Sequence, residues 1–470
     1  MWRCFSSSLK ALSPLDGRYA TATAPLREFY SESALMKYRA RVEIAWFIHL
    51  SKHGLIYDRA GTAVRLTPAD TTDLNSLWQG FAESDGVWIK EKERETNHDL
   101  KAVEYYLKSK MPARLQPLSE FFHVCCTSED INNLSYALMM NDSVQRVVLP
   151  AAFQVRDILS GLAVQHANTP MLSRTHGQPA SPTTLGKEMA NFAYRAHRQI
   201  GRIKEVKLFG KCNGAVGNYN AHIVTYPGLD WLAISREFIE GLGLHYNPFT
   251  TQIEPHDGVG ELCGAVTQLN TVLLDLARDM WGYISLSYFK GAVRAKEVGS
   301  STMPHKVNPI DFENAEGNLG VANALLTHLQ HKLPISRFQR DLSDSTAIRN
   351  IGSGLGYSIL AYHSLVRGFS RASVNDQAIA QDLDQHWEVL AEPVQMILRR
   401  YGFEKPYELL KELTRGKSAM GQRDYQALVQ GLTAKLQLKQ AIVEELTALT
   451  PAKYTGLARV QAASILKHFS

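Results

Sequence analysis

The fold class is decided by residues 262–280, which read LCGAVTQLNTVLLDLARDM. Apolar positions in this segment are separated alternately by four and three residues, at Leu262, Val266, Leu269, Leu273, Leu276 and Met280. That spacing is a heptad seam, and it places the apolar side chains along one face of a long helix. The same spacing recurs at Val148, Ala152, Val155, Leu159 and Leu162, and again at Met189, Ala193, Ala196, Ile200 and Ile203. These seams predict a bundle of long helices packed at shallow angles.

The two ends of the chain differ from its middle. Residues up to about 117 read as shorter helices interrupted near 54–68 and 111–112, and residues after about 368 are interrupted by Gly402, Pro406 and Pro451. Alternating strand patterns are scarce, and Gly and Asn around 215–216 and 222–224 favour loops there. The sequence therefore predicts an all-α chain with an N-terminal domain at 1–117, a central bundle at 118–368 and a C-terminal domain at 369–470.

The composition is that of an ordinary globular protein, with 45% hydrophobic and 21% charged residues among 470. The 51 basic and 46 acidic residues give a net charge of +5. That excess is too small for a nucleic-acid-binding surface, but it is compatible with a cleft for an anionic small molecule. The apolar runs are expected to be too short to cross a bilayer.

Cysteine usage and the chain ends favour a cytoplasmic protein. No C-x-x-C pair occurs among Cys4, Cys125, Cys126, Cys212 and Cys263, which fits a reducing compartment. A redox pair of the adjacent Cys125 and Cys126 is disfavoured, because neighbouring cysteines rarely form a relaxed bridge. Residues 1–12 suggest either a short transit peptide or, preferably, a ragged N-terminus, and the last three residues are not a peroxisomal tag.

Polar residues able to do chemistry are concentrated in four segments: Thr96-Asn-His-Asp99, Cys126-Thr-Ser-Glu-Asp-Ile-Asn-Asn133, Ser173-Arg-Thr-His-Gly-Gln-Pro179 and Gly299-Ser-Ser-Thr-Met-Pro-His-Lys-Val-Asn-Pro309. Each lies near the expected end of a helix, where polar groups in a bundle converge on a cleft. Two weaker patterns have simpler explanations. The glycines at 352–356 favour a helix contact over a nucleotide loop because no strand precedes them, and His328 with His331 favours an exposed helix face over a metal site.

The four segments, in this order, resemble the fumarase/aspartase superfamily, whose signature loop matches 299–309 residue for residue. His305 in that loop, together with Thr250-Thr-Gln-Ile-Glu-Pro-His256, is similar to the bacterial-type adenylosuccinate lyases in particular. The resemblance runs from about Leu12 to the C-terminal region. It implies an all-α, three-domain fold around a central long-helix bundle, no metal or cofactor, and a homotetramer whose active sites each draw on three subunits.

The implied reactions release fumarate from adenylosuccinate, giving AMP, and from SAICAR, the succinylated carboxamide nucleotide of the purine pathway, giving AICAR. Such an elimination needs a base for the carbon next to a carboxylate, an acid for the departing nitrogen, and a clamp for the growing negative charge. The resemblance implies that Ser300 is the base and His176 the acid. Without it, Ser300 and Ser301 are indistinguishable residues of a flexible loop, and His176 is a surface histidine.

The resemblance also implies the residues that bind substrate. Lys306, Asn308, Thr127 and Ser128 are expected to clamp the succinyl carboxylates, and Gln252 to contact a substrate amide. Asn97, His98 and Asp99 are expected to contact substrate, with His98 binding phosphate or orienting His176. The alternative is an N-capping loop with Asn or Asp as the cap and an incidental histidine. Phosphate contacts are expected from Arg18, Tyr19, Arg340, Ser345 and Arg349, for which the alternative is surface ion pairs. Arg340 and Arg349 do not share a helix face, so either a turn between them or two walls of a pocket is needed.

Two rival functions remain open. One is another activity of the superfamily, such as a carboxymuconate cycloisomerase or an argininosuccinate lyase. The other is a non-catalytic scaffold that has kept the fold. Fumarate release from adenylosuccinate discriminates between all of them.

Overall fold

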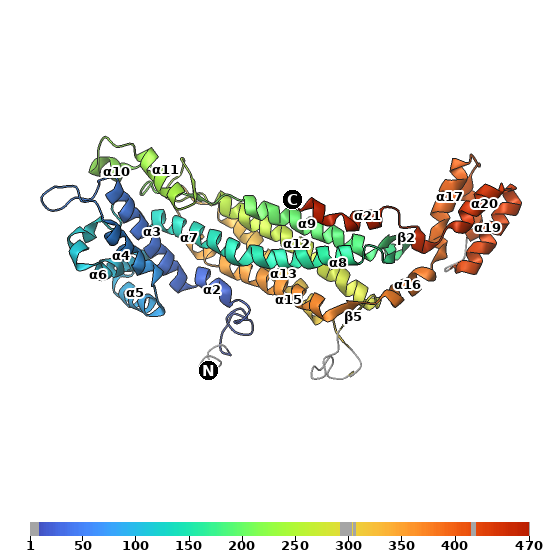
Figure 1. The fold of residues 1–470 in the computed structure, drawn as a ribbon. Coiled ribbons are helices and arrows are strands. Elements are labelled where there is room, and N and C mark those ends of the chain that lie inside the picture. Colours follow the sequence, from blue (N-terminus) through green and yellow to red (C-terminus); the bar gives the residue numbers. More distant parts are fainter. Residues whose placement is uncertain (1–8, 292–302, 304–306, 415–419, 470) are drawn as a thin grey trace. The chain divides into compact units, whose positions relative to one another are not determined.

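The computed structural model describes residues 9–291, 303, 307–414 and 420–469, and its regular structure is mainly helical (Figure 1). The predicted all-α class is confirmed. The described strands form only two-stranded sheets, namely β1–β2, β3–β4 and β5–β6. By its internal contacts the chain divides into two units, which are described separately.

Unit 1 consists of Met1–Ala151, Gln199–Thr271 and Asn318–Leu360. Its central helix, α3 (Glu32–Lys52), begins where the Ser31 hydroxyl accepts from the Ala34 N–H at 3.1 Å. α3 buries Trp46, Phe47 and Leu50 and packs against α4, α6 and α7. The other shorter elements are α2 (Ala24–Tyr30), α4 (Pro68–Gln79), α5 (Glu83–Thr96), α6 (Asp99–Lys110), the 3-10 helix Ala113–Phe121, α7 (Ser128–Ser143), β3 (Phe209–Gly210), α10 (Asn220–Thr225), α11 (Trp231–Gly241), β4 (His245–Tyr246) and α14 (Ser343–Ile348).

Unit 2 consists of Ala152–Arg198, Val272–Gly317 and Ala361–Ser470. Its C-terminal helices enclose a core of Val394, Leu398, Tyr425 and Leu432. The shorter elements are β1 (Pro170–Thr175), β2 (Gln178–Thr184), β5 (Phe289–Gly291), β6 (Ala372–Val374), α16 (Asp376–Asp384), α17 (Ala391–Arg400), α18 (Pro406–Thr414), α19 (Gln422–Leu436), α20 (Gln440–Ala448), α21 (Ala458–Ala463) and the 3-10 helices Trp387–Leu390, Pro451–Lys453 and Ile465–His468.

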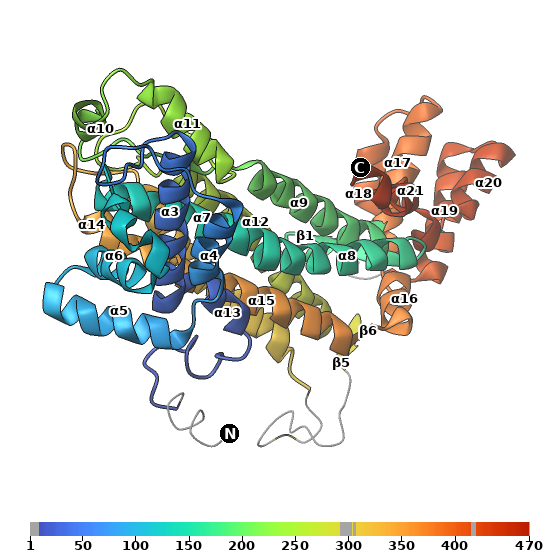
Figure 2. The ribbon, with the colours of Figure 1, turned by 60° about the vertical axis from the view of Figure 1, so that its left-hand side comes forward.

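Long helices contribute residues to both units: α8 (Leu149–Gln165), α9 (Leu185–Glu205), α12 (Asp257–Ser285), α13 (Ile310–Lys332) and α15 (Ile351–Arg371). Within each unit their segments lie side by side (Figures 1 and 2). In unit 1, Asn270 of α12 donates to Ser358 of α15 at 2.9 Å. In unit 2, Arg278 of α12 lies 2.8 Å from Glu316 of α13.

The predicted seams are the buried faces of these helices. Every seam position in α12 and α9 is at most 2% exposed. The seam of α8 holds as far as Leu159, but Leu162 is half-buried and Ala163 is fully buried instead. A straight helix drifts away from a strict seven-residue repeat, and a π-helical turn at Val144–Val148 precedes α8. The drift accounts for the one-residue shift, because the π-helical turn ends well before Leu159.

The structure confirms some of the local expectations and contradicts others. The glycines of 352–356 do form a helix contact, since a Cβ on Gly352 would lie 2.4 Å from the Tyr30 side chain. Residues 215–216 are a loop as expected, whereas 222–224 belong to the short helix α10. The hairpin β1–β2 was not anticipated, because prolines at 170, 179 and 182 argue against strands.

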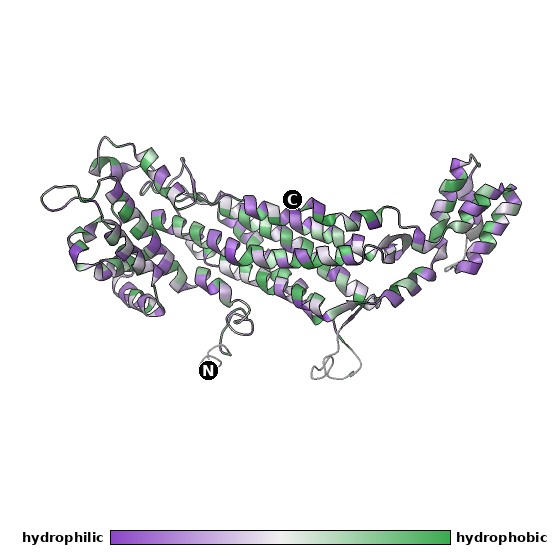
Figure 3. Ribbon diagram, viewed as in Figure 1, coloured by the Kyte–Doolittle hydropathy of each residue, from purple (hydrophilic) through white to green (hydrophobic). Residues whose placement is uncertain are grey.

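One helical stretch corrects the expectation about apolar length. Ser128–Gln165 spans 38 residues, has a mean hydropathy of 1.5 in its most apolar window, and is long and apolar enough to cross a membrane. The core helix of a globular protein meets the same criteria of length and composition, and 44% of this window is buried. Within unit 1, α7 buries Ile131, Leu134 and Leu138 and packs against α3. Hydrophobic and hydrophilic residues alternate along the helices (Figure 3), as packing on one face requires.

The division into domains at 117 and 368 stays a prediction. The two contact units interleave along the sequence, and their boundaries fall inside the long helices.

Candidate active site

The start of α7 carries two of the predicted carboxylate contacts. α7 begins at Ser128, and Thr127 is its N-cap. The Thr127 N–H donates to Oδ2 of Asp130 at 2.8 Å, so that Asp130 ties down the helix start. Thr127 and Ser128 are half-buried. Hydroxyls and N–H groups at a helix N-terminus favour an anion, and the predicted role of both residues stays a prediction.

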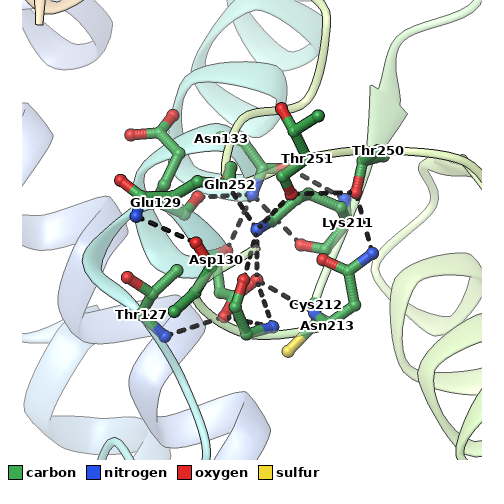
Figure 4. A network of polar contacts seen from close by, with 12 residues as sticks. Thr127, Glu129, Asp130, Asn133, Lys211, Cys212, Asn213, Thr250, Thr251 and Gln252 are labelled. Atoms are coloured by element: carbon green, nitrogen blue, oxygen red, sulfur yellow. Dashed lines mark hydrogen bonds and ion pairs between the residues drawn. The ribbon is translucent and has the colours of Figure 1, made fainter. Parts of the chain in front are cut away.

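A buried lysine that the sequence reasoning missed faces this helix start (Figure 4). Nζ of Lys211 lies 3.1 Å from Oδ1 of Asp130, and both side chains are fully buried. Lys211 follows the short strand β3 in a stretch of Gly, Cys and Asn. A lysine in such a stretch reads as a surface loop residue, and only the fold brings it to α7.

Gln252 lies against the same loop. Its side-chain amide donates to the Ala215 carbonyl at 2.9 Å, and its backbone N–H donates to the Gln339 carbonyl at 3.2 Å. Gln339 directly precedes Arg340. The structure thus brings together three parts of unit 1 that carry predicted substrate contacts: the start of α7, Gln252 and the region of Arg340.

Arg340 is paired with two acids. Its guanidinium lies 2.7 Å from Oδ2 of Asp344 and 3.4 Å from Oε2 of Glu129. The short helix α14 separates it from Arg349 and carries the half-buried Ser345. A phosphate at Arg340 would have to share the guanidinium with these carboxylates.

His256 completes this cluster of buried charges. Its Nε2 lies 3.5 Å from Oδ2 of Asp344. Burial alone would lower the pKa of His256, but the hydrogen bond to Asp344 and the nearby Glu254 and Glu129 outweigh burial and raise the pKa above its usual value. Burial raises the pKa of Glu129. For Asp344 burial is outweighed by His256 and Arg340, so its pKa is lowered.

The Asn97–Asp99 turn confirms part of the capping alternative, with His98 itself as the cap. Asn97 ends α5 in a left-handed conformation with φ of 52°. Nδ1 of His98 accepts from the Lys101 N–H at 3.1 Å. The 4.0 Å approach of Nδ1 to Asp99 is too long to compete with this bond. A ring nitrogen that accepts a backbone N–H carries no proton, so Nε2 of the neutral ring holds it and is a donor.

Asp99 and Arg349 belong to a mixed charge cluster. Arg39, only 2% exposed, lies 2.7 Å from Asp99, and Arg349 lies 3.6 Å from it and 2.9 Å from Glu32. Burial opposes ionisation of Asp99, but Arg39 outweighs burial and lowers its pKa. Arg349 also lines a pocket of about 240 Å³ with Ser13, Asp16, Ser31 and other residues. Arg340 and Arg349 therefore both form ion pairs, which was the alternative to a role in phosphate binding.

Arg18 and Tyr19 lie in the turns before α2, with the Arg18 guanidinium 5.8 Å from the Tyr19 ring centre. Arg18 is exposed. A larger pocket of about 640 Å³ between α2, α3 and α4 is lined by Arg27, Arg41, Trp78 and others, and contains none of the predicted site residues.

His176 stands at the tip of the hairpin in unit 2. Thr175 pairs with Gln178, which leaves His176 and Gly177 as a two-residue turn with φ of 54° and 75°. Such positive values at both central positions are typical of a type I′ turn. A non-glycine residue adopts this conformation only when its surroundings enforce it. The turn presents the imidazole of His176 to solvent, where it can meet a substrate.

Arg174 anchors the hairpin that carries His176. Its guanidinium donates to both carboxylate oxygens of Asp382 in α16, at 2.9 and 2.8 Å, and to the Tyr288 hydroxyl at 2.9 Å. Burial and the neighbouring Asp382 raise the pKa of Tyr288 to about 12. The strand that leads to His176 is thereby fixed to α16.

Most of the predicted site residues in the signature loop, residues 299–309, cannot be placed. Ser300, Ser301, His305 and Lys306 lie outside the described residues. Asn308 is described and half-buried, immediately before α13.

Two clusters in the described part of the chain have the donor atoms for a metal: Glu129, His256 and Asp344, and His49, His53 and Glu237. In the first, Arg340 lies between the two carboxylates, and its charge already occupies the position of a cation. His328 and His331 are exposed on α13, as expected. The absence of a metal stays a prediction.

Comparisons with known proteins identify the family of this chain. Residues 17–323 match the family described as lyase, and residues 336–455 match the family described as adenylosuccinate lyase C-terminal. Adenylosuccinate lyase of Escherichia coli (strain K12) is 52% identical over 460 residues, covering 96% of this chain and 98% of its own length. That of Vibrio cholerae serotype O1 is 53% identical over 459 residues, with the same coverage. That of Legionella pneumophila (strain Corby) is 47% identical, covering 99% of each chain.

Solved structures support the fold alone. A fumarate lyase from Mesorhizobium sp. BNC1 superposes with a TM-score of 0.76 at 18% identity, covering 94% of this chain and 97% of its own. The 3-carboxy-cis,cis-muconate lactonizing enzyme from Pseudomonas putida gives 0.73 at 19% identity, covering 95% and 97%. The helical fold, the family matches and about half-identity over nearly the whole length lead to one conclusion: this chain belongs to the adenylosuccinate lyase family.

Proposed function

We propose that this chain is a carbon–nitrogen lyase that splits adenylosuccinate into AMP and fumarate, and SAICAR into AICAR and fumarate. The observation that carries the proposal is the identity of 47–53% to the adenylosuccinate lyases named above, over nearly their entire length. The substrate is a small molecule, and neither a cofactor nor a metal enters the proposed reaction.

His176 is proposed as the acid that protonates the departing nitrogen, and Ser300 as the base that removes the carbon-bound proton. The exposed turn supports the role of His176, since a general acid can donate a proton only where substrate reaches it. The ammonium of Lys306 and the backbone N–H groups of the signature loop would stabilise the alkoxide of Ser300.

Binding is proposed to use both ends of the substrate. Thr127, Ser128, Lys306 and Asn308 would hold the succinyl carboxylates, and Gln252 an amide. His98 would contact phosphate through Nε2–H, because its Nδ1 is occupied by the cap. Arg18, Tyr19, Arg340, Ser345 and Arg349 are proposed as the remaining phosphate contacts, with Asn97 and Asp99 holding His98 and Arg349 in place.

A cytoplasmic homotetramer with shared active sites is also proposed. The heptad seams give it no support, because their residues are already buried within one chain. Support comes instead from large apolar side chains left exposed on the long helices, namely Val164, Tyr194, Trp281 and Val321. Light scattering behind size-exclusion chromatography tests this, and a monomer would refute it.

Incubation of pure protein with adenylosuccinate, followed by measurement of fumarate, tests the activity. The proposal expects fumarate from adenylosuccinate and none from argininosuccinate. Release from argininosuccinate alone would favour the related lyase, and no turnover of either would favour a scaffold.

A further inference from the structure

We infer that the buried Lys211–Asp130 ion pair is a positioning device, which holds the start of α7, the 213–215 loop and Gln252 in the arrangement that binds substrate. The inference rests on the proposed function and assigns positioning residues to the same site. It comes from the geometry of unit 1 alone.

Asp130 fixes two segments at once. One carboxylate oxygen accepts from the Thr127 N–H at 2.8 Å. The carboxylate also accepts from the N–H groups of Asn213 and Gly214, each at 3.0 Å. A single fully buried side chain thus connects the helix start that carries Thr127 and Ser128 to a loop more than eighty residues away.

Lys211 fixes the third segment (Figure 4). Its ammonium donates to the carbonyl oxygens of Gly214 at 3.0 Å and Gln252 at 2.5 Å, and lies 3.4 Å from that of Thr251. With Asp130 at 3.1 Å, every N–H of the ammonium has an acceptor. The backbone of Lys211 is held as well, since its N–H donates to Asn133 Oδ1 at 2.9 Å and its carbonyl accepts from Asn133 Nδ2 at 3.1 Å.

The backbone segments around the ion pair are closely packed. Gly217 has φ of 82°, and a Cβ there would lie 2.4 Å from the Thr250 carbonyl. The 213–217 loop and the 250–252 segment are therefore in direct contact. Asn213 strengthens this contact by donating to the Thr250 hydroxyl at 2.8 Å.

Stability alone does not call for a buried ion pair here. Apolar residues of similar volume often stabilise a core as well as a buried pair does, because both charges must be desolvated. The contribution of the ion pair is to orient the backbone around it. It orients backbone N–H groups and carbonyls from three segments, and each segment either carries or adjoins a proposed substrate contact.

The test compares Lys211→Met with Glu104→Gln. Glu104 is a matched control, because it is 4% exposed and its carboxylate pairs with the ammonium groups of Lys101 and Lys108 in the same unit, neither of which is proposed to bind substrate. In folded Lys211→Met the KM for adenylosuccinate is expected to rise roughly tenfold or more, with kcat within about threefold, because ground-state contacts are displaced. Glu104→Gln is expected to lower the melting temperature and leave KM unchanged.

Two further variants cover a failure of Lys211→Met to fold. Asp130→Asn removes the negative charge and keeps only one of the two acceptor oxygens for the N–H groups, and Lys211→Met/Asp130→Asn removes both charges together. Each is expected to raise KM several-fold while the double variant regains thermal stability. A folded variant with wild-type KM would overturn the inference, and so would loss of folding in all three, which leaves only a structural role. If wild type releases no fumarate from adenylosuccinate, the proposed function fails instead.

Discussion

Replacement of Arg174 by Met should loosen the hairpin that carries His176. The variant keeps the apolar stem but loses three hydrogen bonds, two of them to the Asp382 carboxylate. Hydrogen bonds to charged groups contribute about 1.5–3 kcal/mol each. Arg174 and Asp382 are 24% and 20% exposed, so water takes over part of the loss. We expect a net destabilisation of about 3 kcal/mol, which corresponds to a fall in melting temperature of roughly 6–12 °C for a unit of this size.

The effect on activity follows from the position of His176, two residues beyond the anchor. We expect kcat for fumarate release to fall about tenfold with little change in KM, because the acid is misplaced while the binding groups are not. Arg278→Met is the matched control. Arg278 pairs with Glu316 at 2.8 Å in the same unit, but it is 64% exposed, so its loss should cost less than about 1 kcal/mol. If Arg174→Met behaves like this control in melting temperature and in kcat, Arg174 does not anchor the hairpin.

Three other predictions concern unit 1. His98→Asn should keep the helix cap but lose the Nε2–H donor, so the KM for adenylosuccinate should rise about tenfold while the melting temperature stays unchanged. His98→Ala should raise KM in the same way and also lower the free energy of unfolding by about 1 kcal/mol, because the cap is lost. A wild-type KM in both variants would exclude His98 from substrate binding. His256 has a raised pKa in the folded state, so its contribution to stability is complete below its usual pKa of about 6.5 and is lost as pH rises through the folded value. The melting temperature of wild type should therefore fall relative to His256→Gln as pH rises above about 6.5, and a constant difference would contradict the charge assignment. Arg349→Ala should mainly raise KM, and intact affinity would remove it from the phosphate site.

The periodic parts of the fold were predictable because burial on one face leaves a repeating pattern. The seams of α9 and α12 are buried at every position. The α8 seam slipped at Leu162, since a straight helix does not keep a seven-residue repeat. The hairpin was not predictable, because its strands contain prolines and lack alternation, and its only signal is the His176–Gly177 turn.

Some residues of the candidate site could likewise be predicted from the sequence, and others could not. Thr127, Ser128 and His98 stand at helix starts, where capping patterns are legible in the sequence. Lys211 could not be found, because its partner Asp130 is distant in sequence and only tertiary packing joins them. The acid partners of Arg340 and Arg349 were foreseen only as a general alternative. Asp344 is four residues from Arg340, but Glu129, Glu32 and Asp99 are distant in sequence and only tertiary packing brings them to the arginines.

The central claim is that this chain eliminates fumarate with His176 as the acid, and fumarate release from adenylosuccinate by wild type and two His176 variants tests it most directly. Asn tolerates the left-handed turn that His176 occupies, so His176→Asn removes the imidazole and keeps the turn, while His176→Ala adds backbone strain. We predict turnover by wild type and a loss of roughly 10²–10⁴ in kcat in both variants, with KM nearly unchanged. Wild-type turnover in His176→Asn would contradict the account.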